Sequence, residues 1–431
     1  MSAKFPTVAI VGSGPSGCYV AQFLQKKWSS AQITIFEALP VPYGLVRYGV
    51  AADHQGSKTV IQQFERMFEK GGVDFRGNVN VGRDISYSKL AESYDVVVLA
   101  TGLSHDADLD IHVHPSAPVV GAGRLLKALN GHPEVELLKN ADGTTRELGR
   151  HVAVIGSGNV AIDVIRMIAK TDRELEGSDI SDEVRTKLNV EQVKSLTLVS
   201  RSSAVDAKCD GSMMAELLSL PGVCVRVEGI VKGEGGAIPE LLTAASNTRK
   251  TSNCSRLSVN FIFNALPSGI DNVYGQAKLT TINRISCIST VRMFDTVITA
   301  IGFNNGTTKE ATVTPRGLGA DAIYQVGWLK RGPKGTVAEN RKDAKLVAEA
   351  IFSDFESGVI KAGKPGLISI ERELSSDVVN YIGWRRIDEY EQNSAKSGRC
   401  RKKINDIRTM LTIAHGANFC VGEVNALEVA N

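Results

Sequence analysis

The sequence predicts an α/β protein with two Rossmann-like dinucleotide-binding domains, the second inserted into the first. Two glycine-rich hexapeptides, at 12–17 and 156–161, carry this prediction, because each follows a short apolar run and opens a helical pattern. A third observation is that a strand, a glycine-containing loop and a helix return late in the chain, at 323–351. In this context the glycines allow a sharp turn and a close approach to a pyrophosphate at a helix N-terminus.

Composition is that of an ordinary globular protein, and the length suggests two domains or more. The chain has 431 residues, of which 43% are hydrophobic and 23% are charged. A net charge of +3 argues against nucleic acid as the main partner, and we find no apolar run long enough for a transmembrane segment. The seven cysteines are scattered without a Cys-x-x-Cys pair, so we expect neither a redox dithiol nor a metal site.

The first βαβ unit runs through an apolar strand at 8–11, the glycine loop with its helix, and a second strand at 33–36. Glu37 follows that strand about twenty residues after the last glycine, where an acid accepts hydrogen bonds from both ribose hydroxyls. An acid favours a ribose without a 2′-phosphate, as in the adenosine half of FAD or NAD. The alternative is a surface glutamate at a strand end. The loop residues predicted to contact the cofactor are Gly12, Gly14, Pro15, Ser16 and Gly17.

Two further segments of the first domain have features of a cofactor site. Residues 40–54 form a long loop rich in Pro and Gly, and ordered loops of this length are usually functional. An apolar strand at 95–102 then ends at Gly102, the form used where a chain passes close to a bound dinucleotide. The segment 294–302 repeats this pattern and is expected to play the same part in the second domain.

The second fingerprint opens a helix that runs to about residue 169, and the next strand is expected at 195–201. Arg201 ends that strand where a 2′-phosphate would lie, and its planar donors match phosphate oxygens. Ser202 offers a further hydrogen bond, whereas the alternative for Arg201 is an ordinary surface arginine. The predicted domains are 1–105 (FAD, first part), 106–322 (NADP) and 323–431 (FAD, second part, with a C-terminal tail).

Two adjacent dinucleotide sites imply a hydride step between a nicotinamide and a flavin. His54 and Asp163 are the titratable groups predicted to lie near that junction. His54 would relay the flavin proton, with Asp163 orienting it or the nicotinamide amide. The alternative for His54 is a loop histidine without a catalytic role. A helix N-terminus at Gly335, Thr336 and Val337 would stabilise negative charge on the reduced ring.

With these residues, the chain resembles the adrenodoxin reductase family, the mitochondrial-type ferredoxin–NADP⁺ reductases with bacterial relatives. The similar stretches are 11–17, 40–54, 77–84, 156–163 and 327–335. The resemblance implies FAD contacts at Ser16, Glu37, Leu45, Val81, Trp328, Gly335, Thr336 and Val337. It implies NADP contacts at Ser157, Gly158, Asn159, Val160, Arg201 and Gly335.

The resemblance also implies an activity: electrons pass from NADPH to FAD and then singly to a [2Fe–2S] ferredoxin. It implies a monomer that meets this ferredoxin transiently through electrostatic contacts. The mitochondrial matrix is the implied compartment, with the cytoplasm as the alternative because no clear transit peptide is visible. Other readings are a nucleotide-binding flavoprotein scaffold, a thioredoxin-reductase-like enzyme and a glutamate-synthase-small-subunit-like reductase. The last two require cysteine patterns that the sequence lacks.

The chain departs from the family pattern in its charges. Ser202 follows Arg201 where the family has two adjacent arginines, and Met213 stands where an acid is expected, so we expect a weakened preference for NADPH. The segment 233–239 has almost no positive charge, so the usual docking patch for an acidic ferredoxin is missing. The candidate replacements are Arg249, Lys250, Arg256, Arg399, Arg401, Lys402 and Lys403.

Overall fold

The protein is described by a computed structural model that covers residues 5–230, 233–248, 256–305 and 322–416. The chain divides into two compact units. Unit 1 comprises residues 1–50, 54–104 and 304–431, and unit 2 comprises 51–53 and 105–303. The chain returns to unit 1 at Asn304 rather than at 323, and residues 51–53 join unit 2, which the sequence did not indicate. Residues 306–321 lie outside the described residues.

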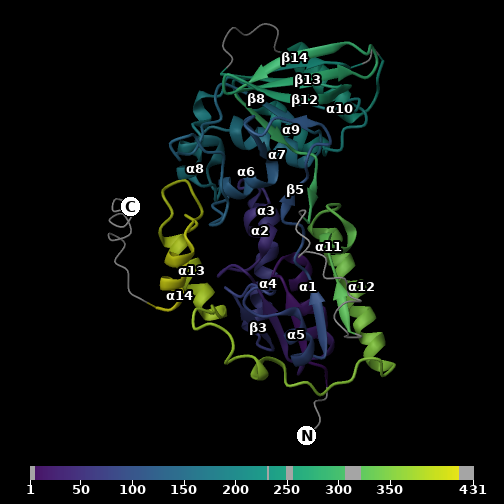
Figure 1. The fold of residues 1–431 in the computed structure, drawn as a ribbon, viewed down its shortest axis with the longest axis vertical. Coiled ribbons are helices and arrows are strands. Elements are labelled where there is room, and N and C mark those ends of the chain that lie inside the picture. Colours follow the sequence, from purple (N-terminus) through teal and green to yellow (C-terminus); the bar gives the residue numbers. More distant parts are fainter. Residues whose placement is uncertain (1–4, 231–232, 249–255, 306–321, 417–431) are drawn as a thin grey trace. The chain divides into compact units, whose positions relative to one another are not determined.

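Unit 1 contains a five-stranded parallel sheet in the order β17-β4-β1-β2-β3. Its edge strand β3 is labelled in Figure 1. The register aligns Val8 with both Ile33 and Val96. β17, from the far side of the insertion, pairs in parallel with β4, which confirms the predicted inserted arrangement. The central strands are apolar throughout because a parallel sheet is buried on both faces. The strands are β1 (Val8–Val11), β2 (Ile33–Phe36), β3 (Val73–Arg76), β4 (Val96–Leu99) and β17 (Ile323–Gln325).

The helices of unit 1 include two long ones that pack against each other, α1 and α12. Trp28, at the end of α1, meets Phe352 and Phe355 of α12 edge-on, with ring centroids 4.8 and 5.2 Å away. A capping box of Thr336 and Glu339 starts α12. The helices are α1 (Pro15–Lys27), α2 (Gly44–Tyr48), α3 (Gln55–Lys58), α4 (Val60–Glu69), α5 (Tyr87–Ser93), α11 (Trp328–Arg331), α12 (Val337–Glu356), α13 (Tyr381–Asn393) and α14 (Ile407–Ala414), with a 3₁₀ turn at Gly366–Ser369.

Unit 2 contains a six-stranded parallel sheet in the order β10-β11-β9-β8-β15-β7. β15 lies beside β8, as β4 lies beside β1 in unit 1. In each unit a strand from later in the chain, β4 or β15, thus pairs directly with the fingerprint strand. This is the repetition of segment 95–102 by segment 294–302 that the sequence predicts. The strands are β7 (Val119–Gly121), β8 (His151–Ile155), β9 (Ser195–Val199), β10 (Val223–Glu228), β11 (Leu257–Ile262) and β15 (Thr296–Thr299).

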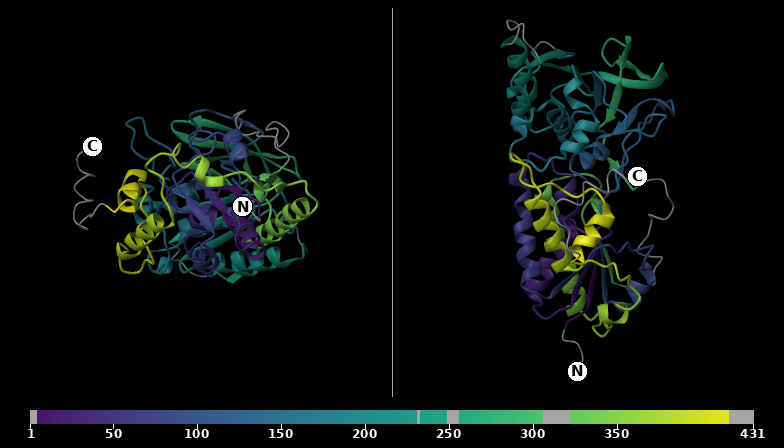
Figure 2. Two further views of the ribbon diagram at one scale, coloured as in Figure 1. Left: turned by 90° about the horizontal axis from the view of Figure 1, so that it is seen from below. Right: turned by 90° about the vertical axis from the view of Figure 1, so that its left-hand side faces the viewer.

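An antiparallel meander covers one side of this sheet (Figure 2, green). Its residues Ile270, Leu279 and Phe294 share a core with Ala153 and Val297 of the parallel sheet. The meander consists of β12 (Ala265–Val273), β13 (Gln276–Asn283) and β14 (Ser289–Phe294), extended by β6 (His112–Val113). β5 (His105–Asp106) and β16 (Phe303–Asn304) form a separate two-stranded sheet. The helices are α6 (Ala122–Leu129), α7 (Asn159–Ala169), α8 (Asp182–Lys187), α9 (Gly211–Ser219) and α10 (Ala237–Thr248), with 3₁₀ turns at Arg173–Leu175 and Val190–Gln192.

The long loop predicted at 40–54 contains more regular structure than the sequence indicates, because it includes α2, a helix of five residues. This helix is too short for a clear 3.6-residue period, so tertiary packing determines it. None of the described helices is long and apolar enough to span a membrane.

Candidate functional site

The first glycine of each fingerprint turns the chain against the backbone of a neighbouring strand. Gly12 has a φ of 105°, and a Cβ added to it would lie 2.5 Å from the Ala100 carbonyl oxygen. Gly156 has a φ of 128°, and its Cβ would lie 2.2 Å from the Ala300 carbonyl oxygen. Only glycine fits either position, because both the conformation and the space exclude a side chain.

The middle glycines face open space instead. A Cβ on Gly14 or Gly158 would meet nothing within 4 Å, and both residues have extended backbone at the N-caps of α1 and α7. Protein packing therefore does not require glycine at these positions. The room in front of each helix N-terminus fits a pyrophosphate, which needs close backbone approach and exposed amides. Both loops thus fit a dinucleotide.

The third fingerprint position differs between the two units. A Cβ on Gly17 would lie 2.1 Å from the Gly12 carbonyl oxygen, so α1 packs tightly on its own loop. Ala161 occupies the equivalent position in α7 and is fully buried. The helix therefore packs closely enough to require glycine at the third position in unit 1, whereas unit 2 accommodates an alanine there.

Glu37 lies against the first glycine loop, and its contact with a ribose stays a prediction. Its carboxylate accepts hydrogen bonds from the Ser13 amide at 3.0 Å and from the Ser13 hydroxyl at 2.5 Å. The Ser13 hydroxyl also accepts from the Tyr43 amide at 3.1 Å. Tyr43 has a φ of 83°, which a bulky residue rarely adopts, and it precedes the helix that carries Leu45. Ser13 thus joins Glu37 to the start of α2.

A buried ion pair fixes the other end of α2. Arg47 is 3% exposed and binds both carboxylate oxygens of Glu391 in α13, at 2.5 and 2.7 Å. Its guanidinium lies 5.0 Å from the ring centroid of Trp384. Arg401 pairs with Glu391 at 3.4 Å, and Lys403 donates to the Arg47 carbonyl oxygen at 3.0 Å. Two of the tail cations suggested as a docking surface are therefore used inside unit 1.

The segment predicted to cover the flavin lies next to the first fingerprint. A Cβ on Gly327 would lie 2.2 Å from the Ser16 hydroxyl oxygen, so Trp328 follows a point of close contact with α1. Gly335 has a φ of 88° and precedes the N-cap Thr336, and α12 begins at Val337 as predicted. The remaining predicted contacts in unit 1 are Pro15, Val81, which is buried, and Gly102, whose φ is 70°.

The second fingerprint is joined to the end of β9 and to the start of α9. The Ser200 hydroxyl donates to the Ser157 hydroxyl at 3.0 Å. Asn159 exchanges hydrogen bonds with Asp210, at 2.7 and 2.8 Å. Arg201 is exposed at the strand end, and the Ser202 amide donates to the Ser200 hydroxyl at 3.2 Å. The predicted NADP contacts of unit 2, including Gly158 and Val160, thus lie on connected segments.

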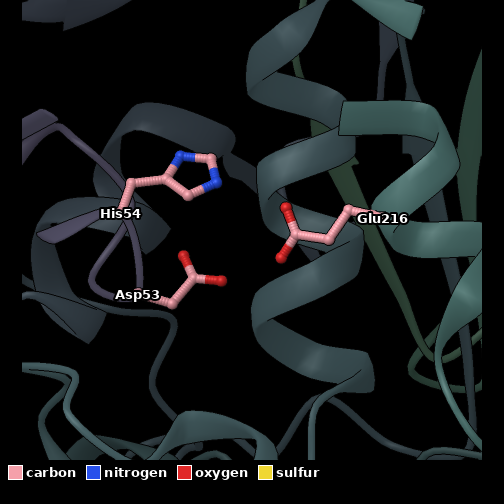
Figure 3. Close-up of side chains that lie close together, drawn as sticks. All are labelled: Asp53, His54 and Glu216. Atoms are coloured by element: carbon pink, nitrogen blue, oxygen red, sulfur yellow. The ribbon is translucent and has the colours of Figure 1, made fainter. Parts of the chain in front are cut away.

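A cluster of buried charges lies along α7. Arg166, fully buried, pairs with Asp53, with Asp163 at 2.6 Å and with Glu216 at 3.2 Å. Lys170 binds Asp53 at 2.5 Å and Glu216 at 2.6 Å. Figure 3 shows the carboxylates of Asp53 and Glu216 turned toward each other. The two cations supply their counter-charge, so these acids do not require a metal ion.

Burial opposes the ionisation of Asp53, but Arg166 and Lys170 outweigh it and hold the pKa of its carboxyl below the usual value. The pKa of Glu216 is also lowered, because the same two cations outweigh its burial. Asp163 is therefore part of a salt-bridge network in unit 2. The chain returns to unit 1 at His54. His54 is the N-cap of α3, and its carbonyl oxygen accepts a hydrogen bond from the Ser57 amide at 3.0 Å.

Sequence reasoning missed Arg47, Glu391, Arg166, Lys170 and Glu216. A usable signal was present for Arg166, which lies three residues after Asp163 and so on the same side of its helix, in an otherwise apolar run. The partners of these charges are distant in sequence, and no local pattern identifies them.

Gly14→Ala tests whether the open space in unit 1 belongs to a cofactor. We expect the apo form of the variant to unfold at the same temperature as the wild-type apo protein. The FAD-loaded variant should retain less FAD after gel filtration than wild type, because the new Cβ enters the predicted pyrophosphate site. Gly17→Ala is the matched comparison and should lower the free energy of unfolding by about 1–3 kcal/mol through overpacking. Wild-type FAD retention by Gly14→Ala would contradict the assignment.

Arg166→Met tests the charge cluster. We expect the free energy of unfolding at pH 7 to fall by about 2–4 kcal/mol, because buried carboxylates lose their counter-ion. Because the carboxyl pKa values are lower in the folded protein, the ionised carboxylates stabilise the fold at pH values above about 4, their pKa in the unfolded chain. This stabilisation is lost as the pH falls through the pKa values of the folded protein. The difference from wild type should therefore narrow below about pH 4 in urea denaturation. The exposed Arg173→Met is the control, and an equal loss there would refute the interpretation.

Comparison with known proteins gives a consistent result. The model of the pyridine nucleotide-disulphide oxidoreductase family matches residues 6–238. Cindoxin reductase of Citrobacter braakii is 39% identical over 426 residues, covering 95% of this chain and 91% of the relative. The mitochondrial NADPH:adrenodoxin oxidoreductase of Arabidopsis thaliana is 29% identical, covering 94% and 95%.

A solved structure extends the likeness to the whole fold. FprA of Mycobacterium tuberculosis in complex with NADPH has a TM-score of 0.82 at 26% identity, covering 95% of this chain and all of that one. The two glycine cradles and these similarities identify FAD and NADP(H) as the cofactors of an oxidoreductase. The chain belongs to the pyridine nucleotide-disulphide oxidoreductase family and, within it, to the adrenodoxin and ferredoxin reductases.

Proposed function

We propose that this protein oxidises NADPH and delivers the electrons, through FAD, one at a time to a [2Fe–2S] ferredoxin. The observation that carries the proposal is the pair of open glycine cradles, with an acid beside one and an arginine beside the other. The names of the relatives support it, since they describe reductases of cindoxin, adrenodoxin and, in Mycobacterium leprae, ferredoxin.

FAD, when bound, would supply the redox chemistry, namely two-electron hydride acceptance from NADPH and release of single electrons. The chain supplies binding and selection. Glu37, held toward the loop by Ser13, would accept hydrogen bonds from an unphosphorylated ribose and would repel a 2′-phosphate. Arg201 would do the opposite in unit 2, where its charge favours the phosphorylated ribose of NADPH.

The roles of the titratable residues are part of the proposal. His54 would carry the proton exchanged with the flavin. Asp163 would orient His54 or the nicotinamide amide. Its carboxylate has a fixed position for this role, because it pairs with Arg166 at 2.6 Å. The N-terminus of α12, at Gly335 to Val337, would stabilise negative charge on the reduced ring.

Two of the candidate docking cations make contacts within the protein. Arg401 is partly buried and pairs with Asp388 at 2.5 Å. Arg256 donates to the Ala169 carbonyl oxygen at 2.6 Å but is exposed, so it stays a candidate. Lys402 is exposed and stays a candidate, whereas Arg249 and Lys250 lie outside the described residues. A mitochondrial compartment stays a prediction, since the relatives include bacterial as well as mitochondrial proteins. The monomeric state also stays a prediction.

An anaerobic titration tests the proposal in two stages. NADPH should bleach the flavin absorbance, and an oxidised [2Fe–2S] ferredoxin should then restore it, with two ferredoxins reduced for each NADPH. Absence of bleaching would favour a nucleotide-binding scaffold. Bleaching that no cognate ferredoxin reverses would remove the proposed acceptor and leave the NADPH step standing.

Arg201→Ala tests the selection of NADPH. Loss of a charge-assisted hydrogen bond of about 1.5–3 kcal/mol should raise the KM for NADPH about 10-fold to 100-fold. The KM for NADH should change little, because NADH has no 2′-phosphate. Steady-state assays with both coenzymes and an artificial acceptor measure this, with the exposed Arg226→Ala as a control. Equal effects on both coenzymes would refute the role of Arg201.

A further inference from the structure

A lysine that the site prediction does not include lies beside the second glycine loop. The Lys208 amide donates to the Ser157 carbonyl oxygen at 3.0 Å, and Lys208 forms a backbone bridge with Gly158. Residues 208–210 therefore run along the fingerprint, since Asp210 also bonds to Asn159. This places Lys208 directly at the edge of the unit 2 cradle.

Lys208 and Ser200, the residue before Arg201, bond to the same residue of that loop. The end of β9 is joined to Ser157 through the Ser200 hydroxyl, and Lys208 is joined to Ser157 through its own amide. The chain thus leaves the loop at Arg201 and comes back to it at Lys208. The backbone therefore carries both cations, seven positions apart in sequence, on segments that adjoin Ser157.

The ammonium of Lys208 is available for a ligand. Lys208 is exposed, and among the described residues it has no carboxylate partner. The nearest acids in sequence have other contacts: Asp206 accepts from the Ser203 hydroxyl at 2.7 Å, and Asp210 accepts from Asn159. Its flexible four-carbon stem carries a compact charge that can reach a phosphate from a backbone position beside it.

A phosphate monoester carries about −1.5 to −2 charges at pH 7, so one guanidinium neutralises only part of it. Ser202, next to Arg201, is uncharged. We propose that Lys208 is the second cation for the 2′-phosphate of NADPH and, together with Arg201, determines the preference for NADPH over NADH. This rests on the proposed placement of the 2′-phosphate beside Arg201.

Binding of adenosine 2′,5′-bisphosphate tests the inference without turnover. Lys208→Ala holoenzyme should bind this ligand about tenfold more weakly by calorimetry, a change of about 1.4 kcal/mol, and should bind ADP as wild type does. Lys194→Ala removes the same charge at the other end of β9 and should change neither affinity. Raising the salt concentration should narrow the difference between Lys208→Ala and wild type.

A rescue variant separates charge from structure. Ser202→Arg in the Lys208→Ala background should restore most of the affinity for adenosine 2′,5′-bisphosphate, because it returns a second cation beside Arg201. Equal weakening of both ligands by Lys208→Ala, or no weakening of either, would overturn the inference. A failure of ferredoxin reduction would not, because this binding assay involves no electron acceptor.

Discussion

The approach of one glycine to a neighbouring carbonyl sets the geometry of each unit. Gly12 on Ala100 and Gly156 on Ala300 bring the end of each fingerprint strand against the strand beside it. The chain must then turn sharply, and the next helix starts with its amides facing open space at Gly14 or Gly158. The open space at both helix N-termini depends on this steric constraint, which no residue with a Cβ satisfies.

Two buried ion pairs explain why the long segment at 40–54 is ordered. Arg47 binds Glu391 within unit 1, and Asp53 binds Arg166 within unit 2. Each pair places charge in a low-dielectric interior, where removal of one partner leaves an expensive unpaired ion. The segment is thus attached to both units by residues only six positions apart. Ordered loops of this length are usually functional, and here the order has an identifiable cause.

The sequence was sufficient for the repeated local features and not for the long-range ones. The fingerprints, their strands and the return of β17 to the first sheet follow from glycine spacing and apolar runs, which are local signals. The partners of the buried charges were not predictable, because Asp53 and Glu216 are distant from Arg166 in sequence. The place of the meander β12–β14 has no local signal either, since it depends on a core shared with Ala153 and Val297.

The interrupted course of unit 1 has a consequence for biosynthesis. Unit 2 is almost continuous in sequence, whereas Glu391 follows Arg47 by 344 residues and β17 is the last strand of the first sheet. Domains generally fold as units during translation, N-terminal segments first. The nucleotide-binding insertion can therefore become native on the ribosome. Until β17 is made, β4 has no strand paired on its outer edge. Unit 1 cannot complete its fold until translation has passed residue 391, because Arg47 lacks its counter-ion Glu391 before that point. Premature termination before that point would leave a folded NADP module on an unfinished flavoprotein.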